Sequence, residues 1–137
     1  MDLKQTTTVL VSGDDRGAAV SRYLDEALGH ACDGLAPDEV PPTESAQVTC
    51  RRHLLAVAQQ WPIGREFPLP RVSGSGDGDI LCQWRRDGRK ALIVFMRDGA
   101  ARVFTALMEA HKTVDTGVTS APSPAETRDA LVWVEGA

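Results

Sequence analysis

Residues 79–109 read DILCQWRRDGRKALIVFMRDGAARVFTALME, and this stretch decides the fold of the chain. Asp87-Gly88 and Asp98-Gly99 are both hairpin signals of the two-residue type, and each lies between runs rich in β-branched and apolar residues. Tight turns at both positions predict a three-stranded antiparallel β-meander.

Side chains alternate between the two faces of a strand, so the turns also decide which residues share a face. Two-residue turns would set Cys82 opposite Ile93, and Ile93 opposite Phe104. We expect the core face to carry the apolar set Ile80, Cys82, Trp84, Ala91, Ile93, Phe95, Phe104, Ala106 and Met108.

The other face of the predicted meander is also too apolar to be freely solvated. We expect the N-terminal helix, the C-terminal segment or a second molecule to cover it, with Arg85 and Lys90 at the rim. The centre of that contact is predicted at Leu81, Leu92, Val94, Val103 and Leu107.

Three helices are predicted around the meander. The first has apolar residues at helical spacing from Ala18 and ends at Gly29. The second begins near Thr43 and presents the stripe Cys50, Leu54, Val57 and Trp61.

The third helix has the most specific start. Ser123-Pro124-Ala125-Glu126 is a capping box with Pro at the first helical position, which predicts a helix to about Val134. A strand over residues 131–134 is the alternative. The preceding residues, 113–121, are predicted to form a loop.

A strand is expected at Thr6–Ser12, so the element order predicts a single α+β domain over residues 1–137, with the meander packed against two or three helices. Residues 1–42 would form an N-terminal strand-helix unit and linker. Residues 43–137 would hold the second helix, the meander and the C-terminal helix. Whether residues 1–42 attach loosely or pack on the core stays open.

Composition limits the classes of function. A chain of 137 residues with 42% hydrophobic and 25% charged residues is typical of a globular domain. The cysteines at positions 32, 50 and 82 show no disulfide framework, and no secretory signal or long apolar run is visible. We therefore expect a cytoplasmic protein without a membrane segment, in which Cys82 is a small core residue.

Charge is distributed unevenly along the chain. Residues 50–112 carry eleven basic and six acidic side chains, although the net charge of the whole chain is −4. This pattern fits either neutralisation within the molecule or an anionic partner. Four basic residues surround the first hairpin tip and are candidates for contact with an anion or a nucleic acid: Arg85, Arg86, Arg89 and Lys90.

Motifs for catalysis or for cofactors are weak. Cys50 and His53 have the spacing of metal ligands, as do His30 and Cys32, but structural zinc needs four ligands that converge. The glycine-rich run 74–79 lacks the Gly-Lys-Ser/Thr of a phosphate-binding loop. We therefore predict no catalytic residue, no metal and no cofactor.

The lead-in to the meander consists of Pro68-Leu-Pro-Arg-Val72, then Asp77-Gly-Asp-Ile-Leu-Cys-Gln-Trp84 and a β-rich hairpin. It resembles a pattern in small uncharacterised bacterial proteins, some of them encoded near toxin–antitoxin or defence genes. The resemblance covers residues 68–105 and implies a bacterial accessory or interaction protein, with no catalytic residues to carry over.

The sequence therefore predicts a non-enzymatic interaction protein. It would act as a homodimer or as a subunit bound to a protein partner through the second face of the meander. The alternative is a nucleic-acid-associated regulator that uses the basic hairpin.

Overall fold

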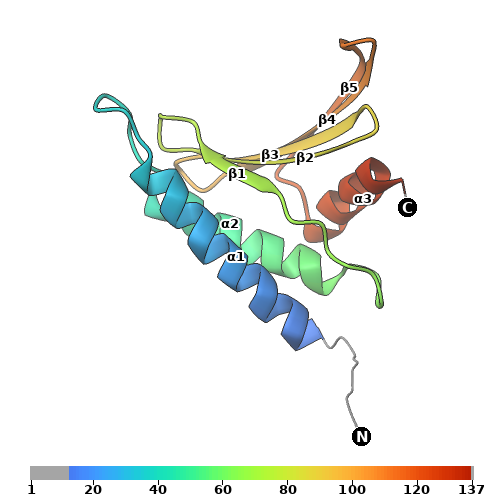
Figure 1. The fold of residues 1–137 in the computed structure, drawn as a ribbon, viewed down its shortest axis with the longest axis horizontal. Helices are drawn as coiled ribbons and strands as arrows, with labels where there is room; N and C mark the ends of the chain where they lie inside the picture. Colours follow the sequence, from blue (N-terminus) through green and yellow to red (C-terminus); the bar gives the residue numbers. More distant parts are fainter. Residues whose placement is uncertain (1–12, 137) are drawn as a thin grey trace, which may run out of the picture.

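In the computed structural model, which describes residues 13–136, a five-stranded antiparallel sheet packs on a layer of three helices (Figure 1). The strands follow one another in the sheet in chain order. The elements are α1 (Gly13–Asp33), α2 (Glu44–Gln59), β1 (Arg71–Gly74), β2 (Ile80–Arg86), β3 (Arg89–Phe95), β4 (Ala101–Glu109), β5 (Lys112–Ser120) and α3 (Pro124–Glu135). The α+β class is confirmed. The strand expected at Thr6–Ser12 lies outside the described residues.

The prediction of three strands was wrong, because β1 and β5 extend the meander at its two edges. β1 has only four residues and follows a proline-rich run, so its sequence carries little strand signal. The loop predicted at 113–121 is the strand β5, and the turn before it lacks the usual residues: Ala110 and His111 both adopt positive φ angles, of 50° and 66°. Such turns are normally marked by Asn, Asp or Gly.

The first hairpin matches the sequence prediction. Asp87 and Gly88 adopt φ angles of 50° and 81°, as a two-residue type I′ turn requires. Trp84 lies opposite Ala91, and Cys82 lies opposite Ile93.

The second hairpin differs from the prediction by one residue. The amide of Met96 donates to the carbonyl of Ala100 at 2.7 Å, which closes a loop of three residues with Gly99 at a φ of 93°. Ile93 therefore lies opposite Val103 and not opposite Phe104. Asp-Gly also suits this longer loop, in which the glycine takes the left-handed position after a type I turn.

The shift of one residue reverses the faces of β4. Val103 now points into the core and is 4% exposed. Phe104, Ala106 and Met108, which were expected in the core, lie on the opposite face.

The helical layer buries the other side of β2 and β3. Thr43 caps α2, and the predicted stripe is buried, although its last residue, Trp61, lies just past the end of the helix. α1 packs on α2, and α3 packs under β2 and β3. The core is completed by Ile80, Cys82, Trp84, Ala91, Ile93 and Phe95.

Two helix boundaries test the sequence prediction. The capping box of α3 is present, and Leu131 and Val134 are buried residues of that helix, so the alternative strand at 131–134 was wrong. α1 continues past Gly29 to Asp33. A glycine inside a helix costs only about 1 kcal/mol, and Leu28 holds this turn in the core at 1% exposure.

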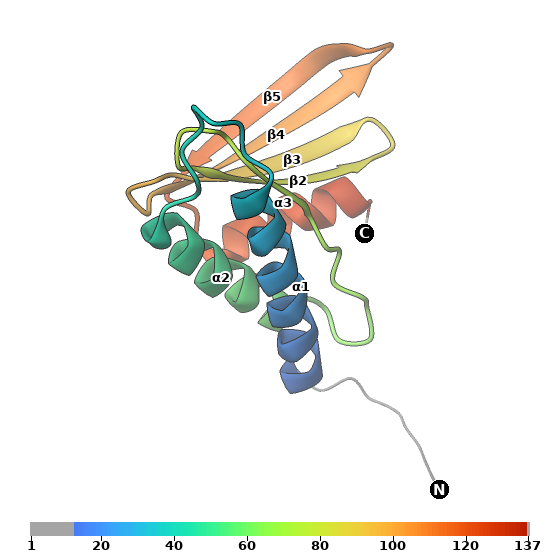
Figure 2. The same cartoon turned by 60° about the vertical axis from the view of Figure 1, so that its left-hand side comes forward.

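All three helices of residues 13–136 lie on the same side of the sheet (Figure 2). Neither α1 nor α3 covers the second face, although both were candidates to do so. That face and the edge of β5 are therefore the parts of the sheet left without a helix against them.

Candidate interaction surface

The sheet face turned away from the helices is called the open face below. The strand register places on it Arg71, Ser73, Leu81, Gln83, Arg85, Lys90, Leu92, Val94, Arg102, Phe104, Ala106, Met108, Thr116, Val118 and Ser120.

Apolar side chains occupy the centre of the open face. Leu92, Phe104 and Val118 stand in register on neighbouring strands and form one row across the sheet. Leu81 and Val94 form a second cross-strand pair beside that row. Val118 is 61% exposed, whereas the other four are half-buried because they cover one another. A shallow depression of about 220 Å³ lies over this row, between Lys90 and Val118.

Basic side chains surround this apolar centre. Arg71, Arg85, Lys90 and Arg102 all belong to the open face, and no Asp or Glu of strands β1 to β5 does. The face is thus apolar in the middle and positive at its rim. Interfaces commonly have an apolar centre and a polar rim, and here the rim has a single sign of charge.

The structure divides the five predicted contact residues between the two faces. Leu81, Leu92 and Val94 lie on the open face, as expected. Val103 and Leu107 lie on the helix side, because the second hairpin has the longer loop. Phe104 and Val118 take their place on the open face.

A signal for the two missed residues was present in the sequence. The open-face position of Phe104 follows if Asp98-Gly99 belongs to a three-residue loop, in which glycine is the last loop residue. Val118 belongs to a run of β-branched residues in β5, which favours a strand even without a turn signal.

The structure also separates the four basic residues of the first hairpin. Arg85 and Lys90 face each other across β2 and β3 on the open face. Arg86 forms an ion pair with Glu135 at 3.1 Å. The guanidinium of Arg89 lies 5.2 Å from the centroid of the Trp133 ring and donates to the Trp133 carbonyl at 2.7 Å.

Arg86 and Arg89 therefore bind to the C-terminal end of α3. A cation there interacts favourably with the last carbonyls of the helix. Only two of the four predicted residues are left for an anionic ligand on the open face.

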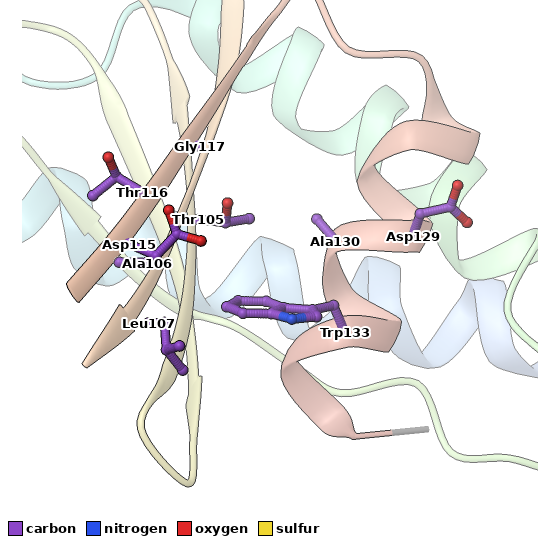
Figure 3. Close-up of a pocket in the computed structure, with 9 residues that line it drawn as sticks. All are labelled: Thr105, Ala106, Leu107, Asp115, Thr116, Gly117, Asp129, Ala130 and Trp133. Carbon is purple, nitrogen blue, oxygen red and sulfur yellow. The ribbon is translucent and has the colours of Figure 1, made fainter. Parts of the chain in front are cut away.

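The β4–β5 hairpin extends beyond the helices, and a cleft of about 410 Å³ separates its helix-facing side from α3 (Figure 3). The Trp133 ring projects from α3 toward Leu107 on β4, and Ala130 lies above it (Figure 3). Asp115 and Asp129 stand on opposite sides of the cleft. The outer part of this hairpin is thus uncovered on both faces.

The buried polar groups are engaged with one another inside the core. The sulfur atoms of Cys50 and Cys82 are 3.9 Å apart, and both residues are fully buried. The hydrogen bond with Cys50, together with burial, raises the pKa of the Cys82 thiol well above its usual value. Such a thiol is a poor nucleophile, because the thiolate is the reactive form.

His53 is a half-buried imidazole. Its Nε2 lies 2.7 Å from the hydroxyl of Thr127, and its ring meets Phe95 edge to face. Burial lowers the pKa of His53. Cys50 and His53 thus face different partners, and within residues 13–136 no group of three His, Cys, Asp or Glu side chains is placed to hold a metal ion.

Comparison of the chain with protein-family models, with curated proteins and with solved structures gives no match. Among the helices of residues 13–136, none combines the length and the apolar character needed to cross a bilayer.

Proposed function

We propose that this protein is a non-enzymatic interaction subunit and that its open face binds an acidic surface of a partner protein. The observation that carries the proposal is the row Leu92, Phe104 and Val118 inside a rim whose charged residues are all basic. The resemblance to small bacterial proteins encoded near toxin–antitoxin or defence genes suggests an accessory role of this kind.

The apolar centre supplies the driving force for such a contact. Covering apolar surface gains roughly 25 cal/mol per Å², so a partner that covers the centre gains several kcal/mol before the cost of association is subtracted. The four rim cations then favour a partner that places carboxylates around an apolar patch. Charge complementarity of this kind acts chiefly on specificity and on the rate of association.

A nucleic acid is the second candidate, since the rim is basic. Sheets that bind single strands stack bases on aromatic side chains. Phe104 is the only aromatic residue that strands β1 to β5 place on the open face, and its neighbours in the centre are aliphatic. Arg86 and Arg89 are engaged with α3. These features favour a protein over a nucleic acid.

The test is a pull-down of the tagged protein from extracts of its source cells at low salt, with mass spectrometry of the captured proteins. Leu92→Asp tests the apolar centre, and Arg85→Glu with Arg102→Glu tests the rim. Val48→Asp is the matched control, because Val48 is a 44% exposed apolar residue on α2, away from the open face.

The proposal expects a stoichiometric protein that the native chain and the Val48→Asp control retain and that both open-face variants lose. Rising salt should weaken the complex, since the rim charges are exposed. Equal capture by all variants would contradict the proposal. Nuclease-sensitive ultraviolet absorbance that disappears with the rim variant would favour the nucleic-acid alternative.

A further inference from the structure

The two edges of the sheet differ in length and in cover. β1 has four residues and packs on α1, and the backbone on either side of it is engaged: the Tyr23 hydroxyl donates to the carbonyl of Pro70, and the Val40 amide donates to the carbonyl of Gly76 at 2.8 Å. β5 has nine residues, and within residues 13–136 its only neighbouring strand is β4. β5 is therefore the edge at which another strand could be added.

The hydrogen-bond pattern shows which backbone groups of β5 are free to pair. The amide of Ala121 donates to the carbonyl of Ala101 at 2.9 Å, so this pair is of the hydrogen-bonded kind. In an antiparallel ladder these pairs alternate with pairs that do not exchange hydrogen bonds. Along β5 the amides and carbonyls that point away from β4 are therefore those of Thr116, Val118 and Ser120.

β5 lacks most of the features that normally protect an edge strand. It contains no proline, its two charged residues are Lys112 and Asp115, and Val118 is 61% exposed. Edges are commonly protected by prolines, by charges or by bulges. A bulge does occur where Leu107 is followed by Met108, and it leaves residues 115–120 as the regular part of the edge.

We propose that a second copy of this chain pairs with β5 in antiparallel orientation about a twofold axis at Val118. Val118 would exchange two backbone hydrogen bonds with Val118 of the second copy, and Thr116 would pair with Ser120. The two sheets would join into one continuous sheet.

Charge favours a second copy as the occupant of this edge. A symmetric dimer brings the same surface of both copies together. On the open face that would set the basic rim of one copy against the same rim of the other. The regular part of β5 contains only one charged residue, Asp115, which lies away from the twofold axis. The edge is thus the surface that two copies can share without repulsion.

Edge pairing also extends the apolar row of the open face. Phe104 and Val118 of one copy would continue into Val118 and Phe104 of the other, since Val118 stands beside Phe104 in register. The dimer would present two open faces on one side. The inference does not depend on the proposed function, because the edge and the face are different surfaces.

Light scattering coupled to size-exclusion chromatography, over a range of concentrations, tests the proposal. Val118→Pro is the most direct variant. Proline removes an amide that points outward and leaves the ladder to β4 intact, which edge strands tolerate. Loss of two hydrogen bonds should raise the dimer dissociation constant by about tenfold or more.

Three further variants show whether an effect of Val118→Pro comes from loss of the dimer. Val118→Lys should have the same effect without restricting the backbone, in case the proline variant does not fold. Val114→Lys changes a 50% exposed valine outside the proposed pairing and should leave the dimer unchanged. Leu92→Asp should also leave the dimer unchanged, which separates this proposal from partner binding by the open face.

Amide hydrogen exchange gives an independent readout of the register. In the dimer, the amides of Thr116, Val118 and Ser120 should become protected, whereas those of Gly117 and Thr119 are already bonded to β4. A native chain that stays monomeric at all concentrations would overturn the proposal. So would a dimer that neither Val118 variant weakens.

Discussion

The inner strands of the sheet, β2 and β3, and the β4–β5 hairpin are strands of the same kind. They differ in how far the helices cover them. In β2 and β3, every second side chain is buried under α2 or α3. In β5, by contrast, almost every residue is exposed. Val103, at the start of β4, is the last strand residue that reaches the core.

The difference shows where the folding of one chain ends and where contact with another molecule is expected to begin. A two-stranded hairpin is marginally stable by itself, so the β4–β5 hairpin depends on its continuation from β3. It nevertheless keeps apolar residues on the open face and a regular edge in water. Stability alone does not explain that arrangement, which supports the interaction role proposed above.

The largest expected difference in stability between the two faces of the sheet is at neighbouring residues of β4. Val103→Asp places a carboxylate in the core and should destabilise the fold by roughly 4 kcal/mol or more. Phe104→Asp should cost only about 1 kcal/mol, because Phe104 is half-buried on the open face. Urea unfolding of both variants measures the difference.

The two-residue reading of Asp98-Gly99 makes the reverse prediction for this pair. A more damaging Phe104→Asp would show that the register of β4 is the one first expected. Similar losses in both variants would mean that a second layer covers the open face in solution.

A smaller effect is expected at the tip of the β4–β5 hairpin. Ala110 and His111 adopt φ angles of 50° and 66°, which are unfavourable for residues other than Gly, Asn and Asp. Replacing both with Asn and Gly should stabilise the protein by about 1 kcal/mol, since the type I′ geometry is kept and the strain is relieved.

The control for the tip is Asp87→Asn in the first hairpin, where the turn already suits its residues and stability should hardly change. Unfolding midpoints in urea with an unchanged slope would report both effects. A loss of stability in the Asn-Gly variant would show that Ala110 or His111 makes a contact worth more than the strain.

The smallest expected effect on stability at neutral pH concerns His53, which lies in the part of the molecule that the helices cover. Burial lowers its pKa in the folded state below the ordinary value of 6.5. The unfolded chain therefore binds the proton more readily, so stability should fall as the pH drops below about 6.5 and level off below the folded pKa.

His53→Gln should weaken this pH dependence. Unfolding free energies of the native chain and of the variant, compared between about pH 7.5 and pH 5, measure the contribution of His53. An identical slope in the two proteins would show that the imidazole takes up its proton as easily in the folded state as in the unfolded one.

Part of the structure of this protein can be predicted from its sequence alone, because the interactions that determine it are local. The Asp87-Gly88 turn, the capping box at Ser123 and the helical stripe of α2 each depend on residues a few positions apart. These interactions are formed within one turn or one helix, so a sequence pattern is enough to predict them.

The tertiary structure decided what local patterns leave ambiguous. Asp98-Gly99 suits loops of two and of three residues, and only packing of Val103 against the helices selects the register. Alternation along β2 and β3 sets Arg86 and Arg89 on the face opposite Arg85 and Lys90, but only the folded chain shows that α3, more than forty residues away, engages them there. The open face and the free edge exist because all three helices of the described chain pack on one side, and that choice depends on long-range burial.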